Sequence, residues 1–341
     1  MSDGHRPGAE ERAGLLLDLG RHAEARREVE AALAAEPDSA SLHGLRSRAL
    51  DGLGEHGEAL ASAERVTALL PGSAAGHRQR AVALLRLGRT PEALAAAQET
   101  VRLEPQHWPH HALLAQVAAD DPRSLRLAWG AALHAVSLAP EQADTHFSVG
   151  FVASRRRDHR TAVTAYERAL AIHPGHATAL HNLALERGGD LSQQARGVGA
   201  ALRLDPQRAD FRASLDRVVR RTLVAAWLAA LVALLLGVGA SADSPADQVV
   251  VLPAALGLVG VVAWLAITLH RLPVGVRRHA VAYVRGRAGT VLLLLATTVG
   301  LTALAATAAL PGRLAPGLVG APLSLLVGLV GVGVTHQRRD R

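Results

Sequence analysis

Residues 141–174 read EQADTHFSVGFVASRRRDHRTAVTAYERALAIHP and close on one of a series of regularly spaced prolines. The series is Pro37, Pro71, Pro105, Pro140 and Pro174, with gaps of 34 or 35 residues, and Pro206 follows after 32. A fixed period of this length is typical of stacked helix pairs, each too small to bury its apolar face alone. The sequence therefore predicts an all-α solenoid, and it favours binding over catalysis.

Small residues recur at fixed distances before these prolines. Glycine stands 17 residues ahead at Gly20, Gly54 and Gly88, and alanine stands 12 ahead at Ala25, Ala59, Ala93, Ala128 and Ala162. Alanine, leucine, arginine and glutamate between them favour helix, and proline stops it. The pattern resembles the tetratricopeptide repeat, a helix–turn–helix unit of 34 residues. The resemblance covers residues 8–210 as about six repeats, the first a degenerate cap and the sixth two residues short at Gly188-Gly189.

The resemblance implies a concave groove lined by the first helix of each repeat. Arginine presents a planar fork that suits carboxylates, so a protein partner or an acidic peptide is the expected ligand. Solvated surface arginine is the alternative explanation for the same residues. The candidate peptide-binding groove residues are Arg48, Arg78, Gln79, Arg86, Gln116, Phe147, Ser148, Phe151, Arg155 and Asn182.

The second half of the chain has a different composition. Four stretches without charged residues, 222–240, 249–269, 288–310 and 315–335, are each long enough to cross a bilayer core. The sequence thus predicts a four-helix transmembrane bundle over 222–336 behind the solenoid. The predicted domain plan is a disordered N-terminus 1–7, the solenoid 8–210, a connecting helix 211–221, the four spans, and a basic cytoplasmic tail 337–341.

Arginines predict the orientation of these spans. Twelve of them precede the first span, link the second to the third, or form the tail, whereas Arg313 stands alone on the opposite side. The positive-inside rule then places both chain ends in the cytoplasm. The absence of lysine and the single asparagine suggest a high-GC bacterial genome, so the predicted location is multi-pass in a bacterial plasma (inner) membrane.

Two features concern packing in the second half. Residues 207–221 place Phe211, Leu215, Val218 and Val219 on one helix face, and glycine is next met at Gly237, so one helix of about 30 residues is expected to run into the first span. The fourth span carries small residues on one face, which allow close helix approach in lipid. This stripe could pack against another span or against a second copy in a homo-oligomer: Gly317, Ala321, Ser324, Gly328 and Gly331.

The charge and histidine patterns argue against a nucleic-acid partner and against a metal site. Residues 1–210 hold 24 arginines and 26 acidic residues, so the basic balance of the chain lies in its second half and no nucleic-acid partner is predicted. His43, His77, His111 and His146 recur at the repeat period, too far apart for one metal ion, and are interpreted as packing residues. The cluster of His107, His110 and His111 lacks a carboxylate at clear ligand spacing, so neither metal nor cofactor is expected.

No catalytic motif is recognisable in the sequence, which lacks cysteine, a phosphate-binding loop and a metalloprotease motif. The resulting hypothesis is a non-enzymatic, membrane-anchored scaffold for protein–protein interaction. Two alternatives stay open from the sequence: a channel or transporter regulated by the solenoid, and a membrane enzyme with an unrecognised site.

Overall fold

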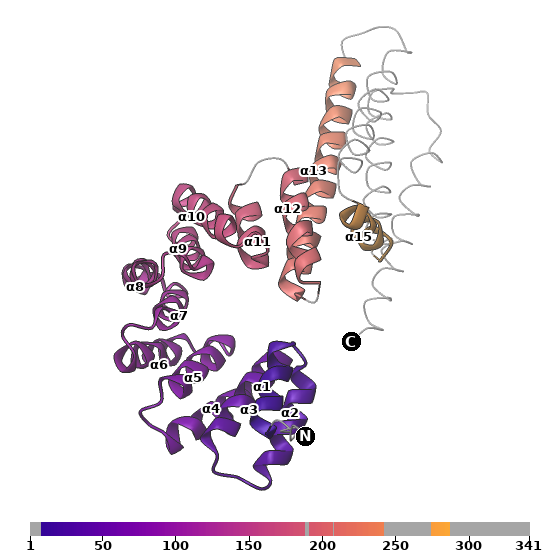
Figure 1. Cartoon of the computed structure of the whole chain (residues 1–341). Helices are drawn as coiled ribbons and strands as arrows, with labels where there is room; N and C mark the ends of the chain where they lie inside the picture. The colour runs from indigo at the N-terminus through magenta and orange to yellow at the C-terminus, as the bar shows by residue number, and fades with distance from the viewer. Residues whose placement is uncertain (1–7, 188–190, 207, 242–273, 287–341) are drawn as a thin grey trace. The chain divides into compact units, whose positions relative to one another are not determined.

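The computed structural model describes residues 8–187, 191–206, 208–241 and 274–286, and the regular elements in these ranges are helices (Figure 1). The predicted all-α class is therefore confirmed for the described part. The predicted N-terminal segment 1–7, the spans 249–269, 288–310 and 315–335 with their small-residue stripe, and the tail 337–341 lie outside these ranges. The predicted first span, 222–240, lies inside these ranges, and among the described residues no helix combines the length and the apolarity that a bilayer crossing needs.

Figure 1 labels the helices in chain order. Their bounds are α1 Ala9–Asp18, α2 His22–Leu33, α3 Ala40–Leu53, α4 His56–Leu69, α5 Ala74–Arg86, α6 Thr90–Leu103, α7 Trp108–Ala118, a 3-10 turn η1 Pro122–Ser124, α8 Leu125–Leu138, α9 Ala143–Arg155, α10 His159–Ile172, α11 Ala177–Glu186, α12 Leu191–Leu204, α13 Ala209–Ser241 and α15 Val274–Gly286.

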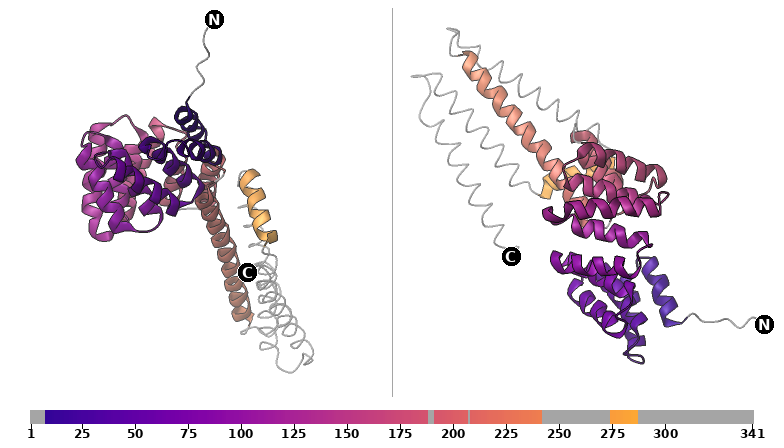
Figure 2. Two further views of the ribbon diagram at one scale, coloured as in Figure 1. Left: turned by 90° about the horizontal axis from the view of Figure 1, so that it is seen from below. Right: turned by 90° about the vertical axis from the view of Figure 1, so that its left-hand side faces the viewer.

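The chain divides into two compact units, Met1–Glu186 and Arg187–Arg341. In the first unit, helices α1 to α10 form five successive pairs, and each pair packs against the next. Figure 2 shows this helical unit from two further sides. The division falls inside the sixth repeat predicted from the sequence, since α11 belongs to the first unit and α12 to the second. The sequence of the shortened repeat has Gly188-Gly189 at this point, and glycine is a poor helix former.

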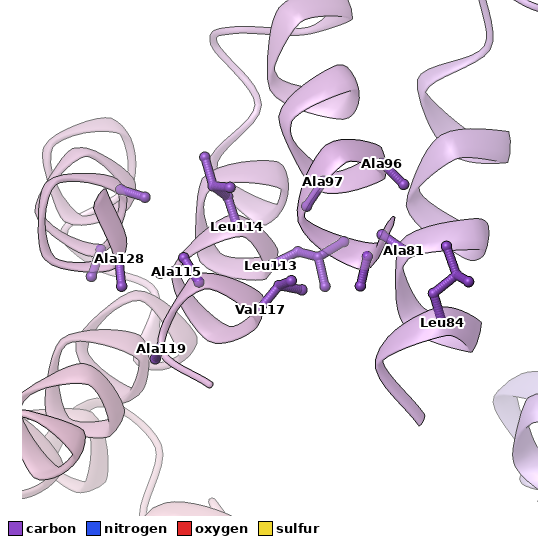
Figure 3. Close-up of a cluster of buried hydrophobic side chains, with 14 of the residues drawn as sticks. Ala81, Leu84, Ala96, Ala97, Leu113, Leu114, Ala115, Val117, Ala119 and Ala128 are labelled. Carbon is purple, nitrogen blue, oxygen red and sulfur yellow. The ribbon is translucent and has the colours of Figure 1, made fainter. Parts of the chain in front are cut away.

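The core of the first unit is built mainly from alanine and leucine. The alanines that stand 12 residues before the prolines are all fully buried: Ala25, Ala59, Ala93, Ala128 and Ala162. The largest cluster of buried side chains runs without a break from α3 to α10, and Figure 3 shows Leu113 and Val117 of α7 in its middle. Small residues at these positions let the second helix of a repeat lie close to the first, as the spacing predicts.

The turn between the two helices of a repeat uses a left-handed residue in the first, second, third and fifth repeats. Gly20, Gly54 and Gly88 have φ angles of 70°, 80° and 72°, and nothing lies within 4 Å of a Cβ placed on any of them. In the fifth repeat the equivalent residue, 17 before Pro174, is Arg157 with φ 62°. A residue with a Cβ is strained by about 1–2 kcal/mol in this conformation. The fold therefore imposes the conformation even where the sequence does not provide glycine.

Arg157→Gly is expected to raise the free energy of unfolding by about 0.5–1 kcal/mol, because relief of the strain exceeds the extra chain entropy of glycine. Gly88→Ala, the matched control at the equivalent turn, should lower it by a similar amount. Urea denaturation followed by circular dichroism measures both changes. Equal midpoints for Arg157→Gly and the parent chain would show that the turn is not strained.

The second unit begins with two packed helices. Helix α13 is continuous over 33 residues, which confirms the predicted single helix of about 30 residues from Ala209 onward. Its first turns bury Phe211, Leu215, Val218 and Val219, the face identified in the sequence, and α13 packs on α12. Helix α15 contacts α13, because the Nε2 atom of His279 in α15 lies 2.7 Å from the Oδ1 atom of Asp216 in α13.

Candidate functional site

At four turns between repeats, a periodic histidine forms a hydrogen bond across the turn. In each case the imidazole Nε2–H donates to the carbonyl oxygen of the proline six residues earlier, over 2.7–3.0 Å in the four turns. Burial lowers the pKa of His111 from its usual value. The predicted packing role of these histidines is therefore confirmed. Each histidine recurs at the repeat period because its hydrogen-bond partner, the proline, recurs at that period. The pairs are His43 with Pro37, His77 with Pro71, His111 with Pro105 and His146 with Pro140.

Three predicted groove residues come together between the second and third repeats. Arg48 of α3 and Arg78 and Gln79 of α5 line a cavity of about 240 Å³. Asp51 and His22 also line it, and neither was identified from the sequence. Asp51 could have been found there, because it lies one helical turn after Arg48 and so shares its face. We call these five residues the arginine cavity.

Arg78 is the cation of the arginine cavity that lacks a counter-charge. Arg48 lies 3.4 Å from the Asp18 carboxylate. No ion pair joins Arg78 to an acidic residue in the described part of the chain, and the Asp51 carboxylate that lines the same cavity contacts the Nδ1 atom of His56 at 3.1 Å. The concave surroundings partly desolvate the Arg78 guanidinium, and the like charge of Arg48 adds to this, so its pKa is lowered. Both effects make an anion from outside the chain favourable at this position.

The Gln79 side chain adds a second recognition group. Its amide oxygen is buried and accepts no hydrogen bond from the described residues. Gly44 allows its close approach, because a Cβ at Gly44 would lie 3.3 Å from the Gln79 amide nitrogen. An amide beside a guanidinium can accept from an N–H group while the guanidinium binds a carboxylate, which is the set of groups that a peptide offers.

A second group of predicted groove residues is aromatic and lies in the fifth repeat. The ring centroids of Phe147 and Phe151 of α9 are 6.2 Å apart, and Phe147 is 5.8 Å from Tyr166 of α10. The Arg155 guanidinium lies 5.1 Å above the Phe151 ring and also pairs with Asp120 at 2.8 Å. Arg155 is thus already neutralised within the chain, unlike Arg78.

The remaining predicted groove residues are dispersed. Asn182 of α11 donates to the Tyr166 hydroxyl over 3.3 Å and so supports packing. Arg86 is exposed and Gln116 half-buried, and neither lines the arginine cavity. Ser148 is a correction: it is fully buried, and its hydroxyl donates to the Asp144 carbonyl one turn earlier. Its face of α9 points into the repeat stack, so it cannot meet a ligand in a groove.

Comparisons with known proteins agree with this architecture. A family model described as tetratricopeptide repeat matches residues 11–74 and 78–126. No curated protein matches the chain. Among solved structures, the Cut9 and Hcn1 hetero-tetramer of the APC/C is similar at 17% identity and a TM-score of 0.52, over 62% of this chain and 42% of that one.

Two further solved structures are similar over about half of this chain. A thermophilic repeat protein from Thermus thermophilus has 21% identity and a TM-score of 0.47, over 51% of this chain and 96% of that one. YrrB, described as having an unusual peptide-binding site, has 16% identity and a TM-score of 0.37, over 53% of this chain and 93% of that one. The family match over residues 11–74 and 78–126 and the five stacked helix pairs make the first unit similar to tetratricopeptide repeats.

Proposed function

We propose that the repeats form a protein–protein interaction scaffold whose arginine cavity binds an acidic segment of a partner protein, without catalysing a reaction. The observation that supports this most directly is Arg78, a partly desolvated guanidinium with a lowered pKa and no acidic partner among the described residues. The attraction of a carboxylate bound there would offset both the desolvation of the Arg78 guanidinium and its repulsion from Arg48. Tetratricopeptide repeats as a class are interaction modules, which agrees with this proposal.

The test measures peptide binding to the arginine cavity. A fluorescent peptide rich in aspartate and glutamate is expected to bind, and Arg78→Ala should weaken it by about 10- to 150-fold, since a hydrogen bond to a charged group contributes about 1.5–3 kcal/mol. Arg78 is a sharper target than Arg155, because Arg155 already has Asp120 as its partner. Fluorescence anisotropy at two salt concentrations gives the affinities.

Arg102→Ala is the matched control for this measurement. Arg102 is an exposed arginine of α6 that pairs with Glu99 and does not line the arginine cavity. Its removal should leave peptide affinity unchanged. The proposal would be wrong if Arg78→Ala bound the acidic peptide as tightly as the parent chain, or if the uncharged asparagine and glutamine version of the peptide bound equally well.

The second part of the proposal is that the chain carries this scaffold at the cytoplasmic face of a bacterial plasma membrane. Its support is in the sequence: four uncharged stretches of span length, and twelve arginines on one side against Arg313 on the other. The solenoid and both chain ends would then face the cytoplasm. The stripe from Gly317 to Gly331 would supply a close-packing face for another span or a second copy.

Cysteine labelling tests this arrangement, because the chain has no cysteine of its own. Ser241→Cys, in the predicted outer loop, should react with an impermeant maleimide in intact cells. Ser41→Cys, on the exposed start of α3, should react only after permeabilisation. Labelling of Ser41→Cys in intact cells, or protection of Ser241→Cys, would contradict the proposed topology.

A further inference from the structure

The turn between α6 and α7 differs chemically from the other turns between repeats. It carries Glu104 at the end of α6, His107 at the start of α7 and His110 in the first turn of α7. Backbone hydrogen bonds link the three in steps of three residues, from the His107 N–H to the Glu104 carbonyl and from the His110 N–H to the His107 carbonyl. This step brings all three side chains to one side of the turn.

The three ligand atoms lie at separations suited to one metal ion. The Nε2 atom of His110 is 3.0 Å from Glu104 Oε2 and 3.2 Å from His107 Nδ1, and His107 Nδ1 is 3.8 Å from Glu104 Oε2. Tetrahedral zinc with bonds of about 2.0–2.2 Å requires ligand atoms roughly 3.3–3.5 Å apart. The three observed separations bracket this range, so only small side-chain shifts would complete the geometry.

The residues at the equivalent position of other repeats do not all cap the following helix: Ser39, Ser73 and His176 do so, and Gln142 does not. In the second and third repeats this position is Ser39 or Ser73, whose hydroxyl accepts a backbone N–H at the start of the helix. His107 begins α7 and makes no such capping bond. A lost cap costs about 0.5–2 kcal/mol. Instead of capping α7, the His107 side chain contacts a second histidine and a carboxylate.

The three side chains differ in burial: one is buried and fixed, and the other two are accessible to solvent. The His110 side chain is only 3% exposed and is held by α7, whereas Glu104 and His107 are each 53% exposed. A rigid buried ligand with two accessible ones lets an ion enter from solvent. It also leaves a fourth position open to water, as in zinc sites with three protein ligands.

We propose that Glu104, His107 and His110 form a binding site for a divalent transition-metal ion, zinc by its preference for this ligand set. Two imidazoles and one carboxylate suit zinc better than magnesium or calcium, which favour oxygen ligands. The site would lock the turn between α6 and α7, and so the mutual position of the third and fourth repeats. It adds a ligand to the proposed scaffold without depending on the arginine cavity.

The test is a zinc titration of the purified, untagged full chain in competition with a chromogenic chelator. We expect one equivalent of tightly bound zinc per chain and a visible absorption band of four-coordinate geometry when cobalt replaces it. His107→Ser should abolish this binding or weaken it by more than the roughly 10–100-fold of a lost outer-shell contact, and Glu104→Gln should do the same. His107→Ser introduces the serine cap that Ser39 and Ser73 provide in two other turns, so it is not expected to impair folding.

His159→Gln is the matched control, because His159 also contacts a carboxylate, Glu186 at 2.6 Å, but the structure shows no third ligand beside this pair among the described residues. It should bind zinc like the parent chain. The proposal is overturned if the parent chain shows no saturable zinc binding, or if His107→Ser and Glu104→Gln bind zinc as tightly as the parent does.

Discussion

Replacing Tyr166 with alanine is expected to lower the free energy of unfolding by about 3–5 kcal/mol, the range for removing a buried aromatic ring. Tyr166 is 1% exposed, and its ring packs against Phe147 and directly on Gly150. Its hydroxyl accepts from Asn182 of α11, so one side chain ties three helices together. Urea denaturation followed by circular dichroism measures the loss.

Two variants separate packing from hydrogen bonding at this position. Tyr166→Phe keeps the ring and removes only the Asn182 bond, so it should cost about 0.5–1.5 kcal/mol. A Cβ on Gly150 would lie 2.6 Å from the ring, so Gly150→Ala should destabilise the parent chain but be tolerated in the Tyr166→Ala background. Additive effects of Gly150→Ala and Tyr166→Ala would argue against this contact.

Leu84→Ala is expected to lower the free energy of unfolding by about 2–5 kcal/mol, because it opens a cavity in a core shared by several repeats. Leu84 of α5 is fully buried in the cluster that runs from α3 to α10. In a solenoid each repeat is stabilised by its neighbours, so a loss of packing at α5 should also destabilise the repeats on either side of it. Hydrogen exchange with mass spectrometry should show weaker protection in α3 and α7 as well as in α5.

Leu87→Ala is the control, three residues along the chain and at the end of the same helix. Leu87 is 41% exposed, so its truncation removes little packing and should change stability by no more than about 0.5 kcal/mol. Similar losses for Leu84→Ala and Leu87→Ala, or faster exchange confined to α5, would contradict a core shared between repeats.

Much of the local structure follows from residue types and spacing. The prolines end helices where the period puts them, and the alanines 12 residues before them are fully buried in all five repeats. The apolar face that begins at Phe211 predicted the continuous helix α13. These features depend on backbone propensity and on contacts between neighbours in the chain, and a periodic sequence repeats them at each turn of the solenoid.

The candidate sites were less predictable. Groove positions inferred from the period included Ser148, which the fold buries, and did not include Asp51, which lines the arginine cavity. The period places a residue on a helix but does not say which neighbouring helix covers it. Arg157 shows the same limit for the backbone, because nothing in its type predicts a left-handed conformation.

By itself, the sequence determined the all-α class, the repeat period, the buried alanines and the start of the long helix α13, since each rests on short-range propensity and recurrent spacing. Only the tertiary structure decided that Arg78 lacks an acidic partner among the described residues while Arg155 has Asp120, and that Glu104 joins His107 and His110 across a turn. Charge pairing and ligand geometry depend on distances of a few ångströms between side chains from different elements. Those distances arise from the packing of helices and from the path of each turn, which spacing along the chain does not specify.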